Sequence, residues 1–174
     1  GVSIKTICAD YFMEAPLHSK NLSVAQKSLK VLDMLIESSI KLEITDIVIP
    51  CVDHSALENK EAMDRFVRQI IKIIPKIERE NINLSLETDL DPQSFINLLN
   101  KINSKNITVN YDIGNSAALG FNHVEELDAY GKKITDIHIK DRVLGGGSVI
   151  LGEGNSDFIS FFKKLKEFDY QGPF

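Results

Sequence analysis

Residues 134–158, ITDIHIKDRVLGGGSVILGEGNSDF, form the most informative stretch of this chain. They combine a short strand pattern ending on His138 and Lys140, a glycine-rich turn, and a second Gly-Glu-Gly turn that leads into a helix. Two earlier strand patterns also end on carboxylates, LSLETD on Glu87 and ITVNYDIGN on Asp112. Glu, Asp and His at three consecutive strand ends make up a set of metal ligands.

Strand and helix patterns alternate along the whole chain. Near-continuous β-branched and apolar runs predict five buried parallel strands, over residues 3–9, 44–52, 83–88, 107–112 and 134–140. Apolar residues at helical spacing predict helices around residues 29–36, 62–77, 95–102 and 158–165, with a shorter one at 123–130. Asp91 before Pro92 is typical of a helix start, and Pro75 should kink or split its helix.

Strict alternation with short connections leaves a doubly wound sheet or a (β/α) barrel as the main architectures. Polar residues at the carboxyl ends of successive strands favour the barrel, because barrels draw their chemistry from that face. A doubly wound nucleotide-binding fold would carry a glycine fingerprint after its first strand, and ICADYFMEAP has none. We therefore expect one (β/α) barrel domain over residues 1–174.

Composition narrows the class of protein and its partners. The 174 residues are 43% hydrophobic, without an apolar run near the length of about eighteen that a membrane helix needs. A net charge of −5 argues against a nucleic-acid partner, because such proteins usually present a basic surface. Two cysteines do not make a disulfide framework, so a cytoplasmic location is expected. We expect no membrane partner, and a homo-oligomer is left open.

The ordered motifs resemble one known family. ICADYFMEAPL, IVIPCVD, LSLETD, YDIGNSAALGF and HIKDR followed by LGEGNSDF are similar, in that order, to strands three to seven of the sugar-phosphate isomerase/epimerase family of xylose-isomerase-like TIM barrels. The same superfamily includes endonuclease IV. The resemblance implies an α/β fold, the (β/α)8 TIM barrel, of which this chain carries a partial barrel truncated at both ends.

The resemblance also implies a metal-dependent activity. In that family a Glu, an Asp, a His and a final Glu bind one divalent metal, and Glu87, Asp112 and His138 match the first three. Mn²⁺, Mg²⁺ and Zn²⁺ all accept such ligands, so the set does not name the metal. Glu87 would act as the base that converts a ketose, such as a pentulose or hexulose phosphate, into an enediolate. The fourth ligand is expected beyond Phe174, so the chain alone should form an open sheet and bind metal weakly.

Further residues are candidates for contact with a sugar or sugar phosphate, namely Asn115, Arg142, Lys140, His54 and Glu153. Each has a structural alternative: a turn role for Asn115, a surface ion pair for Arg142, and structural or solvent-facing roles for the others. Gly145 to Gly147 could present backbone N–H groups to a phosphate, or form only a flexible loop.

Two other functions compete with the isomerase. A non-catalytic sugar-binding or structural relative is compatible with three ligands in place of four. An apurinic endonuclease would need additional histidines at the strand ends and a basic groove for DNA. The chain instead has Asn115 where several relatives have His, and an acidic balance.

Overall fold

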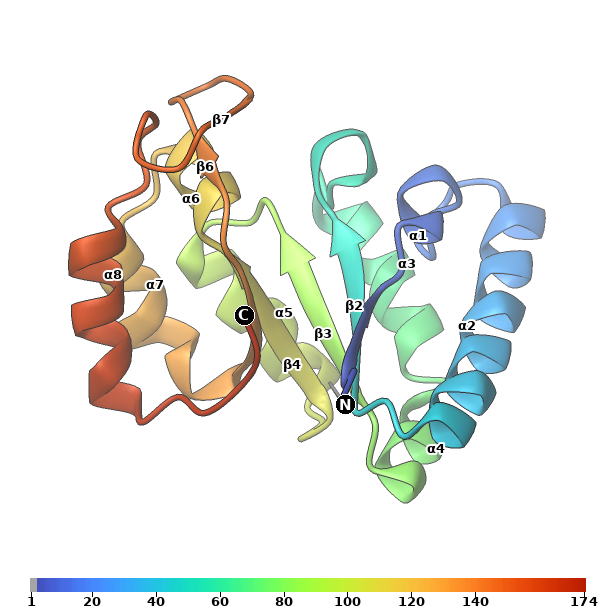
Figure 1. Ribbon diagram of the computed structural model, residues 1–174. Coiled ribbons are helices and arrows are strands. Elements are labelled where there is room, and N and C mark those ends of the chain that lie inside the picture. The colour runs from blue at the N-terminus through green and yellow to red at the C-terminus, as the bar shows by residue number, and fades with distance from the viewer. Residues whose placement is uncertain (1–2) are drawn as a thin grey trace.

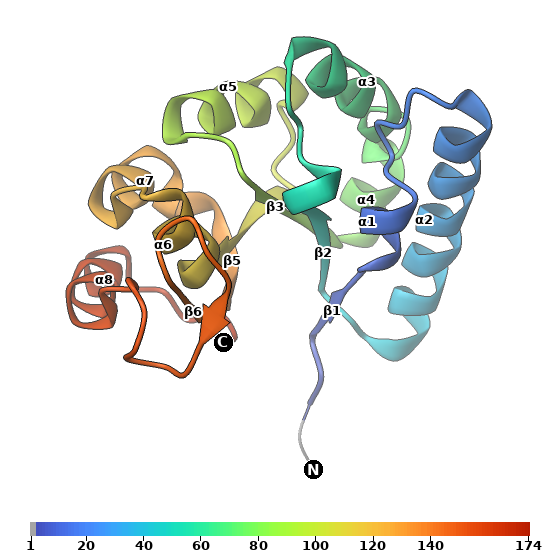
Figure 2. The ribbon, with the colours of Figure 1, turned by 90° about the horizontal axis from the view of Figure 1, so that it is seen from above.

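The computed structural model describes residues 3–174 and contains one curved sheet of five parallel strands, in the order β1-β2-β3-β4-β5. The helices lie along the convex side of this sheet, which gives half of a barrel (Figures 1 and 2). The strands are β1 (Thr6–Cys8), β2 (Asp46–Cys51), β3 (Asn83–Thr88), β4 (Ile107–Asp112) and β5 (Ile134–His138). The partial (β/α)8 barrel expected from the sequence is confirmed.

Helices connect consecutive strands and follow the last one. They are α1 (Tyr11–Glu14), α2 (Leu22–Leu42), α3 (Lys60–Ile70), α4 (Ile74–Glu80), α5 (Pro92–Ile102), α6 (Ile113–Leu119), α7 (His123–Tyr130) and α8 (Phe158–Leu165). Pro75 lies in the first turn of α4, where its missing N–H costs no hydrogen bond, so the expected split is confirmed. The side chain of Asp91 accepts from the Ser94 N–H at 3.0 Å and begins α5 as expected.

The two faces of the sheet have opposite character. Alternate strand residues such as Leu84 and Leu86 are fully buried in the core between the sheet and the helices. The residues between them face the concave side, where the hydroxyl of Ser85 lies 2.8 Å from that of Thr108 and 2.7 Å from that of Thr135. Side chains alternate along a strand, so one strand supplies both the apolar core and the polar barrel interior.

Several sequence-based boundaries are wrong. The first strand covers Thr6–Cys8 instead of 3–9, because only these residues pair with β2. The last strand ends at His138, and the chain then forms a separate hairpin of β6 (Asp141–Arg142) and β7 (Ser148–Val149). On α8, Phe161 is buried whereas Ile159 is 87% exposed.

The sheet is open at both edges. Among residues 3–174, β1 pairs only with β2 and β5 pairs only with β4, as expected for a partial barrel. The segment that ends the chain lies beside β5, where a Cβ atom on Gly172 would come 2.8 Å from the backbone oxygen of Thr135. None of the described helices has the length and apolar character needed to cross a membrane.

Candidate metal centre

Glu87, Asp112 and His138 converge at the carboxyl end of the sheet. Asp112 and His138 are the last residues of β4 and β5, and Glu87 is the last but one of β3. One side-chain donor atom from each lies within 4.8 Å of the other two. The convergence expected from three successive strand ends is therefore confirmed.

An irregularity in the pairing of β4 with β5 sets this arrangement. Val109 pairs with Ile134 but Asn110 pairs with Asp136, so Thr135 is an extra residue on β5. As a result Asp112 lies opposite His138; uninterrupted pairing would have placed Ile137 there. Bulges of this kind commonly re-aim side chains beside functional sites.

His138 presents its Nδ1 atom to both carboxylates. Nδ1 lies 3.4 Å from Glu87 Oε2 and 3.8 Å from Asp112 Oδ2. Hydrogen bonding to Asp112, and then to Glu87, raises the pKa of His138 to about 10, against the opposing effect of burial. Ligands about 2.0–2.3 Å from a shared ion lie roughly 3–4 Å apart, and both separations from His138 fall in that range.

Asp112 makes several polar contacts although its side chain is only 3% exposed. Its Oδ1 accepts the backbone N–H of Asn115 at 2.8 Å and so caps the N-terminus of α6. Its Oδ2 lies 2.8 Å from the ammonium nitrogen of Lys140. Burial alone would raise the pKa of Asp112, but the hydrogen bonds from His138, Lys140 and Asn115 lower it.

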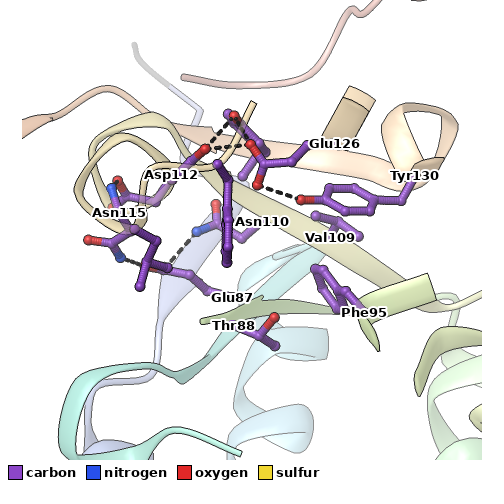
Figure 3. Close-up of a pocket in the computed structure, with 13 residues that line it drawn as sticks. Glu87, Thr88, Phe95, Val109, Asn110, Asp112, Asn115, Glu126 and Tyr130 are labelled. Carbon is purple, nitrogen blue, oxygen red and sulfur yellow. Dashed lines mark hydrogen bonds between the residues drawn. The ribbon is translucent and has the colours of Figure 1, made fainter. Parts of the chain in front are cut away.

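Two asparagines hold Glu87. Asn110 donates from Nδ2 to Glu87 Oε2 at 2.9 Å, and Asn115 donates from Nδ2 to Glu87 Oε1 at 2.5 Å (Figure 3). The nitrogen of Asn110 also lies 3.1 Å from His138 Nδ1. Asn110 was not among the candidates from the sequence. Its position two residues before Asp112, on the same face of β4, was the signal that could have found it.

Arg142 joins the hairpin to this group. Its Nη1 donates to Asn115 Oδ1 at 2.8 Å and its Nε donates to the backbone oxygen of Gly146 at 3.0 Å. Because the oxygen of the Asn115 amide accepts from Arg142, the nitrogen of that amide is directed at Glu87. The sequence candidates Asn115, Lys140 and Arg142 therefore all lie around the three converging residues.

The other two candidates lie elsewhere. His54 sits in the short helix η1 (Asp53–Ser55), where its Nε2 is 3.3 Å from Glu14 Oε1 and its side chain is 58% exposed. Glu153 lies in an exposed turn, and its backbone N–H donates to the oxygen of Ile150. Within residues 3–174, neither side chain has a hydrogen bond or ion pair to Glu87, Asp112 or His138.

Asp141 organises the loop after the hairpin. Its carboxylate accepts backbone N–H groups from Gly152, Gly154 and Ser156 at 2.9, 2.9 and 3.0 Å. Burial would raise the pKa of Asp141, but these donors outweigh it and lower that pKa to about 2. The Gly-Glu-Gly turn recognised in the sequence thus serves to wrap a buried carboxylate.

Comparisons of this chain with a family model and with known proteins agree on one family. The family model of xylose isomerase-like TIM barrels matches residues 1–174. A candidate L-ribulose-5-phosphate 3-epimerase, SgbU of Haemophilus influenzae, is 30% identical over 187 residues, covering 100% of this chain and 65% of the relative. The L-ribulose-5-phosphate 3-epimerase UlaE of Salmonella paratyphi C is 27% identical, covering 100% of this chain and 64% of the relative.

A solved structure supports the fold. The crystal structure of the protein IOLI with a bound zinc atom superposes with a TM-score of 0.79 at 19% identity, covering 97% of this chain and 65% of that one. The chain thus spans about two thirds of the length of these three relatives.

Proposed function

Because this chain belongs to the xylose isomerase-like TIM-barrel family, we propose that the protein containing it is a metal-dependent sugar-phosphate isomerase or epimerase. The observation that carries this proposal is the convergence of Glu87, Asp112 and His138 at the carboxyl end of the sheet, where barrel enzymes have their active sites.

These three residues would hold a divalent metal. Two carboxylates and one imidazole nitrogen suit Mn²⁺, Mg²⁺ or Zn²⁺, and the zinc atom in the IOLI structure makes zinc one of the ions to test. When bound, such an ion would polarise a sugar carbonyl and its neighbouring hydroxyl. The low exposure of Glu87 and Asp112 would limit competition from water.

In this proposal Glu87 is the general base. It would take the proton from the carbon beside the carbonyl, and the electron pair left behind would spread over an enediolate. Asn110 and Asn115 hold the two oxygens of Glu87, so the carboxylate is directed into the site before substrate arrives. A base fixed in this way needs little reorganisation during proton transfer.

The positively charged side chains around the site suit a phosphorylated, oxygen-rich substrate. Lys140 and Arg142 are both partly exposed, with side chains 35% and 21% accessible, so each could also reach a sugar oxygen or a phosphate. Two relatives carry names of L-ribulose-5-phosphate 3-epimerases, which favours a pentulose 5-phosphate among the ketoses. His54 and Glu153 could contribute only through longer contacts with such a substrate.

We also propose how the barrel and its metal site are completed. Closure of this fold takes eight strands and the described sheet has five. We therefore propose that residues 1–174 form one part of a single barrel domain, and that a fourth carboxylate from the remainder completes the metal site. In an epimerase that carboxylate would return the proton on the opposite face of the substrate.

The test is proton exchange in deuterated water. The protein containing this chain should incorporate deuterium beside the carbonyl of L-ribulose 5-phosphate and convert it to its 3-epimer, and a chelator should abolish both. Binding of the sugar phosphate without exchange or conversion would instead identify a non-catalytic sugar-binding relative.

A further inference from the structure

Glu126 on α7 is a buried carboxylate that the proposed reaction does not use. It is only 3% exposed, and no Lys, Arg or His among residues 3–174 forms an ion pair with it. Three hydroxyls donate to it instead: those of Tyr111 at 2.8 Å, Tyr130 at 2.9 Å, and Ser116. A buried charge without hydrogen bonds would be strongly destabilising, so these donors account for its presence.

Two of the three donors are sequence neighbours of site residues. Tyr111 precedes Asp112 at the end of β4, and Ser116 follows Asn115 in α6. Both donate to the same oxygen, Glu126 Oε2, so this atom joins the strand to the helix that follows it. Tyr111 and Asp112 point to opposite sides of the sheet, so Glu126 contacts this junction from the side away from the site.

The third donor differs. Tyr130 lies four residues after Glu126 on the same helix, α7, and its hydroxyl donates to the other carboxylate oxygen, Oε1. Its ring packs against Phe95 at a centroid distance of 5.0 Å. Loss of its hydroxyl would remove one bond from Glu126 without releasing β4 or α6.

A small cavity is lined both by Glu126 and by residues of the candidate metal centre. Its volume is about 20 Å³, the size of one water molecule. Glu126 lines it together with Glu87, Asp112 and Asn115 (Figure 3). Ser116 also lines it. A movement of Ser116 or Glu126 would therefore change the shape of a cavity that Glu87, Asp112 and Asn115 also line.

We propose that Glu126 is a positioning residue for the site. It holds the junction between β4 and α6 through Tyr111 and Ser116, and so fixes Asp112 and Asn115 relative to Glu87. For metal binding this inference rests on the proposed function, but the fixing of the junction can be measured separately.

Three variants of the protein containing this chain test the inference. Ser116→Ala removes the link between Glu126 and α6, and Glu126→Gln weakens all three links. Tyr130→Phe is the matched control, because it removes one hydroxyl bond to the same carboxylate while leaving the junction tied. The first measurement is hydrogen exchange of the Asn115 backbone N–H, which donates to Asp112. The second is Mn²⁺ affinity by titration calorimetry.

Ser116→Ala should speed the exchange of Asn115 and weaken Mn²⁺ binding, each by about tenfold, the change that a single charge-assisted hydrogen bond can produce. Glu126→Gln should act in the same direction. Tyr130→Phe should leave both values within about twofold of the wild type, whatever its effect on melting temperature. A purely structural role would lower stability in all three variants without changing metal affinity.

Wild-type exchange and affinity in Ser116→Ala would overturn the inference, and so would equal changes in Tyr130→Phe. If Glu126→Gln does not fold, the comparison of Ser116→Ala with Tyr130→Phe decides the matter. If the wild type binds no Mn²⁺, Mg²⁺ or Zn²⁺, the proposed metal site fails, and the exchange of Asn115 alone decides whether Glu126 fixes the junction.

Discussion

Glu87→Gln should separate catalysis from binding in this site. The amide keeps the shape of the side chain and one oxygen, but it cannot accept a proton as a carboxylate does. Turnover should fall by about a hundredfold or more, the usual size of a general-base contribution. Binding of substrate should change much less, because the amide keeps one oxygen for the metal and Lys140 and Arg142 remain in place.

The contacts of Glu87 also determine how Glu87→Gln affects the stability of the fold. Its two oxygens accept from Asn110 at 2.9 Å and from Asn115 at 2.5 Å. In the Gln variant the new NH₂ group must face one of these donors, which leaves a buried N–H without an acceptor. That loss costs about 1–3 kcal/mol, so the melting temperature should fall.

The assay is deuterium incorporation into L-ribulose 5-phosphate followed by NMR, with the folded fraction measured by circular dichroism at the same temperature. Glu61→Gln makes the same chemical change at an exposed position of α3 and should behave as the wild type. Near-normal exchange in folded Glu87→Gln would show that another residue is the base.

The remaining predictions concern the neighbours of the metal ligands. Lys140→Met should tighten Mn²⁺ binding several-fold, because it removes a positive charge next to Asp112; unchanged affinity in a calorimetric titration would contradict this. Arg142→Lys should raise KM for the sugar phosphate about tenfold, because Lys cannot contact Asn115 and the hairpin backbone together; steady-state kinetics would check it. The carboxylate of Asp141 should stabilise its loop above about pH 4, and this contribution should be lost as the pH falls toward its folded pKa of about 2. Hydrogen exchange of the three loop amides should show that loss, and Asp141→Asn should reproduce it at neutral pH. Residues 1–174 expressed alone should bind Mn²⁺ more weakly than the complete protein, whereas equal affinities would mean that three ligands suffice.

The order of the five strands and the three converging residues were predictable from the sequence. Buried parallel strands read as apolar runs, and their carboxyl ends must meet at one edge of the sheet. Glu87, Asp112 and His138 each stand at such an end, so local patterns were enough to place them together. Asp91 and Pro75 likewise marked helix boundaries through chemistry that acts within one turn.

The contacts that orient those residues depended on tertiary structure. The extra residue Thr135 in β5 places Asp112 opposite His138, and nothing in the apolar pattern of either strand specifies that register. Asn110 lies on the same face of β4 as Asp112, but its hydrogen bond to Glu87 depends on how β3 pairs with β4. The hydroxyl cluster around Glu126 also depends on how α6 and α7 pack, which spacing along the chain does not give. Local sequence patterns therefore specify which groups meet at the end of the sheet. The register and the helix packing set how those groups are held, because hydrogen bonds between distant segments form only after the chain has folded.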